Sequence, residues 1–419
     1  MTALGDLLGP LFLCPAIILL LLQSRFISCI ATNMHQFSLL PPLALYIHFP
    51  WCVRKCPYCD FNSHQLKGEL AETAYIDALL ADLEQDLPRI WGRSINSIFM
   101  GGGTPSLFSA NSIEHLLSGL RARLTFAPNV EITLEANPGT VEQQRFADFH
   151  AAGINRLSIG VQSFQDTQLQ QLGRIHTGKQ AIRAAEVAHK VGFENFNLDL
   201  MFALPAQTRR FALDDLQTAI DLSPAHISYY QLTIEPNTLF HKHPPVLPDD
   251  ELAWTMQCEG QARLAAAGYT QYEISAYAQA KKQCRHNLNY WQFGDYLGIG
   301  AGAHDKITDM AQQQITRCWK VKHPDAYLDK AATEQRIAGS RNLNQADTVL
   351  EFMLNALRLT HGFDIDMFQQ HTGLPVNSIE AAIQQAEAKG WLAQTRDRIQ
   401  PSEAGQRFHN DLVSLFLPA

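Results

Sequence analysis

Six short apolar runs separated by longer amphipathic stretches constrain the fold of this chain more than any other feature. The runs, rich in β-branched and aromatic residues, lie at 43–49, 95–100, 130–134, 154–161, 193–200 and 227–232. Between them, apolar residues three and four positions apart predict helices at 70–87, 112–124, 141–152, 179–191 and 211–222. Such alternation is typical of βα units that build a parallel sheet. We therefore predict an α/β fold with an open, partial (β/α)6 barrel of the TIM type.

Polar residues and glycines follow the ends of several predicted strands. In chain order they are Gly101, Gly102, Gly103, Thr104, Glu135, Gln162 and Asp199. In a βα barrel the carboxyl ends of the strands share one face, which holds the active site. We expect these residues to converge there, because burying them without a ligand would be costly. Taken singly, the glycine run can be an ordinary tight turn, and either carboxylate can be a strand-end cap or an ion-pair partner.

The first predicted strand runs into a loop with three cysteines in a C-x3-C-x2-C pattern, namely Cys52, Cys56 and Cys59. Three thiolates can hold three irons of a 4Fe-4S cluster, since a cubane offers one thiolate site per iron. The fourth iron then stays open and can chelate the amino group and carboxylate of S-adenosylmethionine (SAM). The loop therefore predicts a SAM-binding iron–sulfur cluster.

A structural zinc site of the Cys3His type is the alternative for this loop, with His48 or His64 as the fourth ligand. Structural zinc sites usually combine two C-x2-C-like pairs. The chain has no second pair, because Cys258, Cys284 and Cys318 are isolated. The cysteine pattern therefore favours the cluster over zinc.

Length and charge narrow the class of protein further. A chain of 419 residues exceeds what one hydrophobic core usually supports, so we expect a large domain and a smaller one. The 33 basic and 41 acidic residues give a net charge of -8, so no overall electrostatic attraction favours a nucleic-acid partner. Cysteines that must stay reduced to bind iron indicate a reducing compartment, and we expect a cytoplasmic location.

The N-terminal stretch 7–22 is apolar and has to be weighed as a signal peptide or membrane helix. It is shorter than the about 20 residues that a membrane span needs, and Gly9, Pro10 and Pro15 interrupt it. The positively charged start of a secretory signal is also missing. We expect Met34 to be the functional start and residues 1–33 to be a dispensable extension.

The sequence from residue 42 onward predicts three structural parts. We expect the core barrel at 42–245, ended by a proline-rich linker, and a barrel-extending segment at 246–340 whose glycine-rich strand lies beside the barrel. Residues 341–419 should form a C-terminal α+β domain that resembles a winged helix, because helices are followed by a small hairpin. Its helix at 377–389 carries one lysine and two glutamates, so packing or partner contact is expected there rather than DNA binding.

Five motifs together resemble the radical SAM superfamily. They are the loop Tyr-x-His-x-Pro-x-Cys-x3-Cys-x2-Cys, the GGGTP turn, Glu-Ala-Asn-Pro at 135–138, GVQSF at 160–164 and NLDLM at 197–201. More narrowly, the chain from about residue 42 onward resembles the HemW haem chaperones and their relatives, the oxygen-independent coproporphyrinogen III oxidases. The resemblance implies that the three cysteines bind the cluster. It also implies SAM contacts from Tyr46, Tyr58, Gly102, Gly103, Thr104, Glu135, Gln162, Arg174 and Asp199.

Two features separate these two branches. The oxidases have a further cysteine two residues after the last cysteine of the loop, where this chain has Phe61. The run His286-Asn287-x-x-Tyr290-Trp291 resembles the HNxxYW haem-binding motif of the chaperones. Imidazole is a common axial ligand of haem iron, and the aromatic residues offer flat apolar surface. From the residues alone, a core histidine packed among aromatic side chains is the favoured interpretation.

The resemblance implies a cytoplasmic haem chaperone that carries a SAM-binding 4Fe-4S cluster and hands haem to an acceptor, expected where respiratory enzymes are assembled at the membrane. The alternative is the oxidase itself, a porphyrin-biosynthesis enzyme that decarboxylates two propionates of coproporphyrinogen III. Whether the protein is an enzyme stays open at this point, and a homodimer is one option for its assembly. One departure from the family pattern is Asp305, where serine is more common, in a loop expected to contact SAM.

Overall fold

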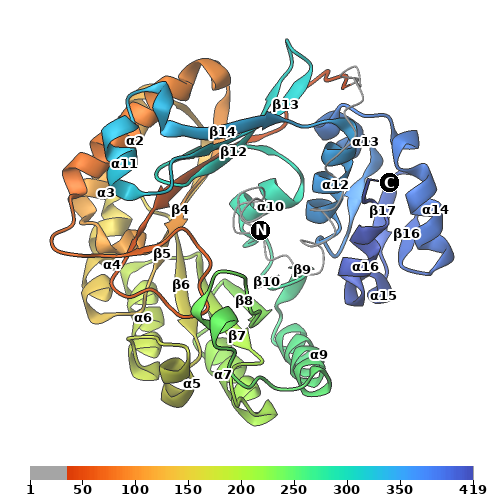
Figure 1. Ribbon diagram of the computed structural model, residues 1–419. Coiled ribbons are helices and arrows are strands. Elements are labelled where there is room, and N and C mark those ends of the chain that lie inside the picture. The colour runs from red at the N-terminus through yellow and green to blue at the C-terminus, as the bar shows by residue number, and fades with distance from the viewer. Residues whose placement is uncertain (1–34, 419) are drawn as a thin grey trace.

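The computed structural model describes residues 35–418, and the side chains of all of them except 140–144. The expected extension 1–33 and the start at Met34 lie outside the described residues. Strands of the described chain form a 12-stranded sheet, a 3-stranded sheet and a 2-stranded sheet. The large sheet curves around a central space, and helices cover its outer face (Figure 1). None of the helices between residues 35 and 418 combines the length and the apolar character needed to cross a membrane.

Six parallel strands form the middle of the large sheet, which confirms the predicted βα units. They are β1 (Leu43–Phe49), β4 (Ser94–Gly102), β5 (Thr125–Ala136), β6 (Arg156–Gln162), β7 (Phe196–Phe202) and β8 (His226–Gln231). The connecting helices are α2 (Glu72–Asp86), α3 (Ala110–Arg123), α4 (Thr140–Ala152), α6 (Gly178–Val191) and α7 (Arg209–Asp221). Each overlaps the stretch in which its apolar spacing predicted a helix.

The barrel stays open because additional strands extend both edges of the sheet. On one side, β11 (Asp295–Ile299) pairs in parallel with β1, and β12 (His304–Asp309), β13 (Gln314–Lys320) and β14 (Ile337–Asn342) continue antiparallel. On the other side, β10 (Ala276–Ala278) and β9 (Thr270–Glu273) follow β8. The expected glycine-rich strand beside the barrel is β11. The predicted fold class, a partial barrel, is confirmed.

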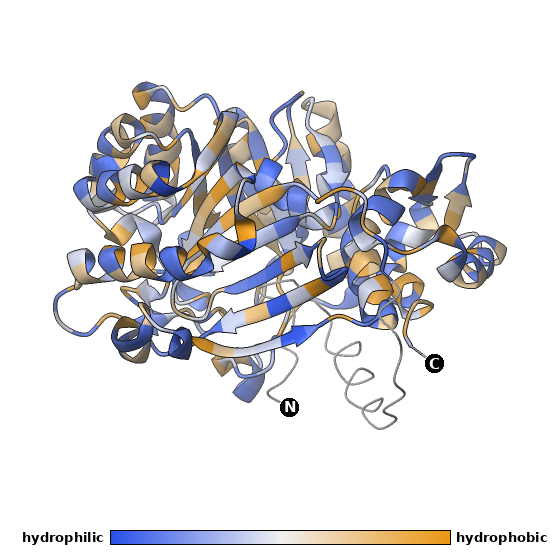
Figure 2. Cartoon of the chain, turned by 90° about the horizontal axis from the view of Figure 1, so that it is seen from above, coloured by the Kyte–Doolittle hydropathy of each residue, from blue (hydrophilic) through white to orange (hydrophobic). Residues whose placement is uncertain are grey.

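The two faces of the parallel strands differ in chemistry. On β6, Leu157, Ile159 and Val161 belong to the main apolar core, whereas Arg156 and the other alternate residues line a cavity on the inner face. Successive side chains of a strand point to opposite faces. The outer face, covered by helices, is therefore apolar, and the inner face, toward the cavity, is polar. Figure 2 shows hydrophilic and hydrophobic residues along the same strands. The interior is hollow, unlike the side-chain layers that fill a TIM barrel.

The C-terminal part has an apolar core of its own around Phe352, Phe368 and Leu412. It contains α12 (Gln345–Ala356), α13 (Ile365–Thr372), α14 (Glu380–Ala388) and a 3-stranded sheet of β15 (Phe363–Asp364), β17 (Arg398–Pro401) and β16 (Leu392–Gln394). Three helices with a hairpin match the expected winged-helix-like arrangement. The short elements α13 and β15 were not predicted, because two turns and two residues carry too little periodicity. Phe37, near the start of the described residues, also packs into this core.

A buried network of charges joins helix α2 to the sheet extension. Lys320 Nζ lies 2.7 Å from Asp82 Oδ1 and also contacts Asp86. Arg336 bridges the same two carboxylates at 2.8 Å each. All four side chains are buried. Each charge is therefore balanced by at least two opposite charges, because Asp86 also pairs with Arg89 at 3.2 Å. Such compensation is the condition under which burying ions is tolerated.

We expect Asp82→Ala to destabilise the protein by about 3–5 kcal/mol, because it leaves the buried Lys320 and Arg336 under-compensated. Glu186→Ala is the matched control: Glu186 pairs with Arg183 at the surface, and its loss should change the free energy of unfolding by less than about 1 kcal/mol. Urea unfolding followed by circular dichroism measures both. Equal effects of the two substitutions would contradict the role of the network.

Candidate functional site

A single cavity of about 760 Å³ occupies the inside of the curved sheet. Every residue that the sequence predicted as a site residue lines it: Tyr46, Cys52, Cys56, Tyr58, Cys59, Gly102, Gly103, Thr104, Glu135, Gln162, Arg174, Asp199, His286, Asn287, Tyr290 and Trp291. The expected convergence of the strand-end residues is therefore observed for all of them except Gly101, which does not line the cavity. Their roles as cofactor ligands stay predictions.

The cysteine loop closes one end of this cavity. It begins with β2 (Trp51–Cys52), which pairs with β3 (His64–Gln65) and so ties the two ends of the loop together. All three thiols are half-buried. Burial raises the pKa of Cys59 to about 11 and also raises that of Cys52. Thiolates at this position therefore need a nearby cation, and bound iron would supply that charge.

The loop fits an iron–sulfur cluster better than the zinc alternative. His48 contacts Asn62 O at 2.9 Å and Tyr46 Oη at 3.0 Å, and His64 contacts Asn62 Oδ1 at 3.2 Å. Zinc binding at His48 would therefore require one of its two hydrogen bonds to break, and His64 Nε2 would have to leave Asn62. Within residues 35–418, no three or more His, Cys, Asp or Glu side chains gather as ligands of one ion. A structural zinc site needs four closed ligands, whereas three thiolates suit a cluster with one open iron.

The glycine run after β4 packs against the cysteine loop. Gly102 has φ +106°, and a Cβ there would lie 2.3 Å from the His48 ring. A Cβ on Gly103 would lie 2.5 Å from the carbonyl oxygen of Trp51. The Gly103 N–H donates to Phe49 O at 2.6 Å. The protein's own packing therefore requires these glycines, and the predicted approach to a ligand is a second role for the same backbone.

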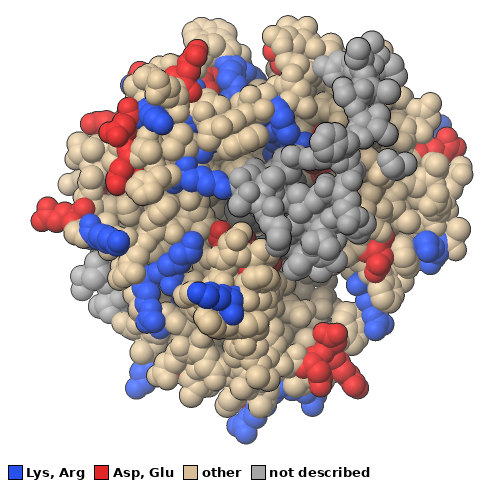
Figure 3. Space-filling model, in the orientation of Figure 1, with Lys and Arg blue, Asp and Glu red and all other residues tan. Residues whose placement is uncertain are grey.

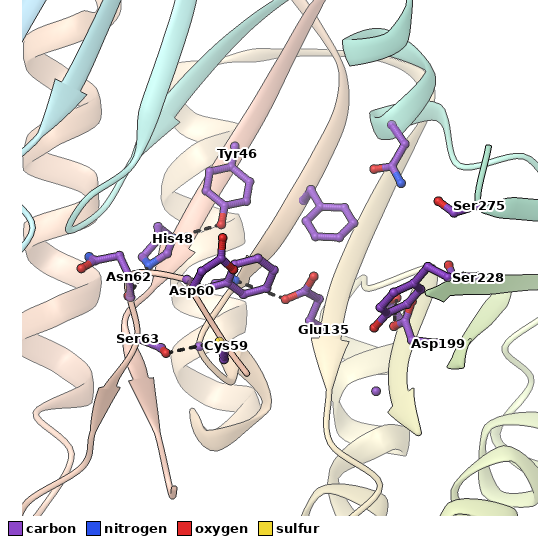
Figure 4. A pocket seen from close by; sticks show the side chains of 18 of the residues that line it. Tyr46, His48, Cys59, Asp60, Asn62, Ser63, Glu135, Asp199, Ser228 and Ser275 are labelled. Carbon is purple, nitrogen blue, oxygen red and sulfur yellow. Dashed lines mark hydrogen bonds between the residues drawn. The ribbon is translucent and has the colours of Figure 1, made fainter. Parts of the chain in front are cut away.

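Two carboxylates from different strands point into the cavity (Figure 4). Glu135 accepts a hydrogen bond from Gly102 N at 3.2 Å, and burial together with the negative charge of Asp199 raises the pKa of Glu135 to about 8. Asp199 accepts from Asn197 Nδ2 at 2.8 Å and from Ser158 Oγ at 3.0 Å, and burial raises its pKa too. Neither carboxylate forms an ion pair with a residue of the described range. A ligand with ammonium or hydroxyl donors would satisfy them.

Arg174 lies in the cavity wall, although an arginine at this position could equally be a solvated surface residue from the sequence alone. Its Nη2 donates to Asn137 Oδ1 at 2.6 Å and to Gly160 O at 2.7 Å, and its Nη1 lies 3.7 Å from Cys56 Sγ. This arrangement fixes a positive charge beside the cysteine loop. Gln162, on the same wall, has φ +69° and accepts from the Tyr230 hydroxyl at 2.9 Å.

The HNxxYW residues lie on helix α10 (Arg285–Trp291), which contributes to the other end of the cavity. His286 Nδ1 lies 3.0 Å from Ser97 Oγ, and its Nε2 lies 3.0 Å from the Tyr290 hydroxyl. Burial, with a smaller effect of the Arg156 charge, lowers the pKa of His286 to about 3. The imidazole is therefore neutral, the form that binds metals. Both nitrogens are already hydrogen-bonded here, as in the core-histidine interpretation, so iron binding at Nε2 requires the Tyr290 hydroxyl to move.

Asp305, the departure from the family pattern, does not line the cavity. It is fully buried and accepts two hydrogen bonds from Arg89, at 2.8 and 3.0 Å. The carboxylate therefore has a structural partner behind the sheet.

The inner residues of the strands give the cavity its depth and were not predicted from the sequence. They are Arg156 and Ser158 on β6, Asn197 on β7, and His226 and Ser228 on β8. His226 contacts Asn197 Oδ1 at 2.6 Å and the Tyr272 hydroxyl at 2.8 Å. The signal that could have found them is a polar residue at every second position of an otherwise apolar strand.

Comparisons with known proteins agree with this fold and this site. The family model of the radical SAM superfamily matches residues 46–218, and the model of the HemN C-terminal domain matches residues 343–408. The structure of coproporphyrinogen III oxidase (HemN) from Escherichia coli, a radical SAM enzyme, superposes with a TM-score of 0.76. The superposition covers 97% of this chain and 99% of the HemN chain. Because the two sequences are only 20% identical, this likeness shows a shared fold and nothing about function. The fold and the site thus define a radical SAM protein.

Curated relatives place the chain more narrowly. It is 51% identical over 378 residues to heme chaperone HemW of Escherichia coli, with 90% of this chain and 99% of that protein covered. The HemW of Haemophilus influenzae is also 51% identical, with 90% and 98% covered. A mitochondrial radical S-adenosyl methionine domain-containing protein 1 of Bos taurus is 36% identical, with 78% and 75% covered. The chain belongs to the HemW family.

The raised pKa of Glu135 predicts a pH dependence of stability. Since the folded protein holds this proton up to about pH 8 and the unfolded chain releases it near 4.5, protein without ligands should lose stability as pH rises between these values. Glu135→Gln should flatten that part of the profile. Thermal unfolding at a series of pH values measures it, with the surface substitution Glu186→Gln as control. Identical profiles for Glu135→Gln and wild type would contradict the raised pKa.

Proposed function

We propose that this protein is a haem chaperone that holds a SAM-binding 4Fe-4S cluster and transfers haem to an acceptor protein. One observation carries the proposal: the cysteine loop and the HNxxYW helix line the same cavity, in a chain that is 51% identical to a protein named heme chaperone HemW. The volume of about 760 Å³ lies within the range of small-molecule sites.

We assign the cluster to Cys52, Cys56 and Cys59, which leaves one iron open for SAM. A reduced cluster of this kind can supply the electron that cleaves SAM. Within the cavity wall, Glu135 and Asp199 offer acceptors for the ammonium and hydroxyl groups of SAM. The remaining contacts are assigned to Tyr46, Tyr58, Gly102, Gly103, Thr104, Gln162 and Arg174.

We assign the haem iron to His286 Nε2. Metal-binding histidines usually have their second ring nitrogen fixed by a hydrogen bond, and Ser97 Oγ lies 3.0 Å from His286 Nδ1. Asn287, Tyr290 and Trp291 would border the macrocycle, because all three line the same cavity. In this proposal, the Tyr290 hydroxyl leaves Nε2 when iron arrives.

The acceptor and the location follow from the same proposal. We place the protein in the cytoplasm, where the loop cysteines stay reduced, and expect a haem acceptor among membrane-associated respiratory proteins. Acidic and basic side chains both occur on the molecular face shown in Figure 3, which gives no support to a nucleic-acid partner. A homodimer is compatible with the proposal and is not required by it.

Coproporphyrinogen III oxidation is the second candidate, and the likeness to the HemN fold is the observation behind it. Phe61 stands where the oxidases have their further cysteine, and it lines the cavity. We therefore expect no consumption of coproporphyrinogen III by the reconstituted protein under anaerobic conditions with SAM and a reductant. Release of CO2 and protoporphyrinogen would overturn the chaperone assignment.

The cluster assignment predicts about four irons per chain after anaerobic reconstitution of the wild type. Alanine at Cys52, Cys56 or Cys59 should remove most of the iron and the visible absorption of the cluster. Cys258→Ala is the matched control, because Cys258 is half-buried like the loop cysteines but does not line the cavity. Bound zinc in place of iron, or full iron content in the loop variants, would contradict the assignment.

The haem assignment predicts opposite effects of two neighbouring substitutions. His286→Ala should weaken haem binding at least tenfold, because it removes the iron ligand, while leaving the cluster intact. Tyr290→Phe should bind haem as tightly as wild type or more so, because it frees Nε2 and keeps the aromatic ring. An anaerobic haem titration followed by the Soret band measures both. Equal affinity of His286→Ala and wild type would reject His286 as the ligand.

A further inference from the structure

One buried arginine that lines the cavity is not among the residues assigned to the cluster, SAM or haem. Arg156 is the first residue of β6 and lines the cavity. It is only 2% exposed. The cysteine loop lies beyond the other end of this strand, where Gln162 stands. Six residue steps of about 3.3 Å separate Arg156 from Gln162, or about 20 Å along the strand.

The Arg156 guanidinium is buried without a paired anion. Its Nε has no hydrogen-bond partner among residues 35–418, and none of these residues forms an ion pair with it. By contrast, Arg317 and Arg358 on the same cavity wall form ion pairs with Glu351 and Glu273. A guanidinium without a directly paired anion keeps charge-assisted donors unused. A carboxylate brought by a ligand would occupy them.

The carboxylates that influence Arg156 already have other partners. Glu131 and Asp199 interact with it through space. Glu131 Oε1 accepts from the His286 backbone N–H at 3.2 Å, and Asp199 accepts from Asn197 and Ser158. The two carboxylates therefore attract the guanidinium without pairing with it, and its N–H donors remain available to a ligand.

Two other buried N–H donors on cavity-lining residues also have no hydrogen-bond partner in the described part of the chain. Trp291 Nε1 is buried and has no hydrogen-bond acceptor within the described chain, and the same holds for Arg358 Nε. The Arg358 guanidinium lies 4.4 Å above the Trp291 ring, so these two donors belong to one cluster. Arg156, Trp291 and Arg358 all line the cavity, so N–H-bearing side chains gather in its HNxxYW part.

The position of Arg156 points to a tetrapyrrole and away from SAM. The carboxylate of SAM would bind at the open iron of the cluster, beyond the far end of β6. Arg156 acts electrostatically on His286, the proposed haem ligand, as well as on Glu135 and Asp199. Haem carries two propionates, and a planar guanidinium binds a carboxylate through two parallel hydrogen bonds.

We propose that Arg156 binds a propionate carboxylate of the haem whose iron is held by His286. This inference rests on the proposed function and adds a second anchor to it. His286 would fix the metal, and Arg156 would fix the orientation of the macrocycle within the cavity. A ligand without carboxylates would lose the second anchor and keep the first.

The experiment compares iron protoporphyrin IX with its dimethyl ester on the reconstituted full chain, in one detergent buffer. Wild type should bind haem about 10- to 100-fold more tightly than the ester, which is the range expected for a charge-assisted hydrogen-bonded pair. Arg156→Gln should lower haem affinity to the level of the ester and leave the affinity for the ester unchanged. Its spectrum should still show histidine ligation, whereas His286→Ala should lose that signature with both ligands.

Thermal unfolding separates this role from a structural one. Because Arg156 has no paired anion in the absence of haem, Arg156→Gln should unfold at the wild-type temperature or above. Arg156→Lys keeps the charge without the planar fork and should give an intermediate preference for haem over the ester, even if the glutamine variant folds poorly. An unchanged haem-to-ester ratio in both variants would overturn the inference. Failure of wild type to bind either ligand would instead overturn the proposed function.

Discussion

The polar side chains on the inner face of the parallel strands are the constraint on which the rest of the structure depends. Strands of a parallel sheet are usually apolar on both faces, because helices cover both. Here Ser158, Asn197, Asp199 and His226 face inward and satisfy one another through a shared network. They cannot pack into an apolar core, so the interior stays hollow. The stability of the fold then rests on the layer between sheet and helices and on the buried ions around Asp82.

The outer layer is the part of the fold that sequence reasoning predicts well. The strand predicted at 43–49 is β1 with the same bounds, because its apolar run is uninterrupted and local. The residues after the strands converge as expected, since the parallel topology alone brings them to one edge. The depth of the cavity was not predicted. Arg156 looks like a strand-start residue in the sequence, and Arg358 reaches the cavity only through the packing of the C-terminal part.

Individual roles within the site are harder to predict than its position. The glycine run shows this well, because its conformation serves contacts with His48 and Trp51 whether or not a ligand binds. His286 is a second example. Its hydrogen bonds to Ser97 and Tyr290 are compatible with a core histidine and also with a metal-binding histidine in the absence of the metal. Spacing in a sequence specifies which residues meet. It does not specify which of their hydrogen bonds a ligand replaces.

The cavity is best understood as one space with two differently built regions. The cysteine loop, Glu135 and Arg174 suit a charged cofactor, whereas α10 and Arg156 suit a flat anionic one. A structure of the anaerobically reconstituted protein with SAM and haem tests this account most directly. We predict a cubane on Cys52, Cys56 and Cys59 and haem iron on His286, with both groups inside the cavity. Haem bound on the outer surface, or a fourth protein ligand that closes the cluster to SAM, would contradict it.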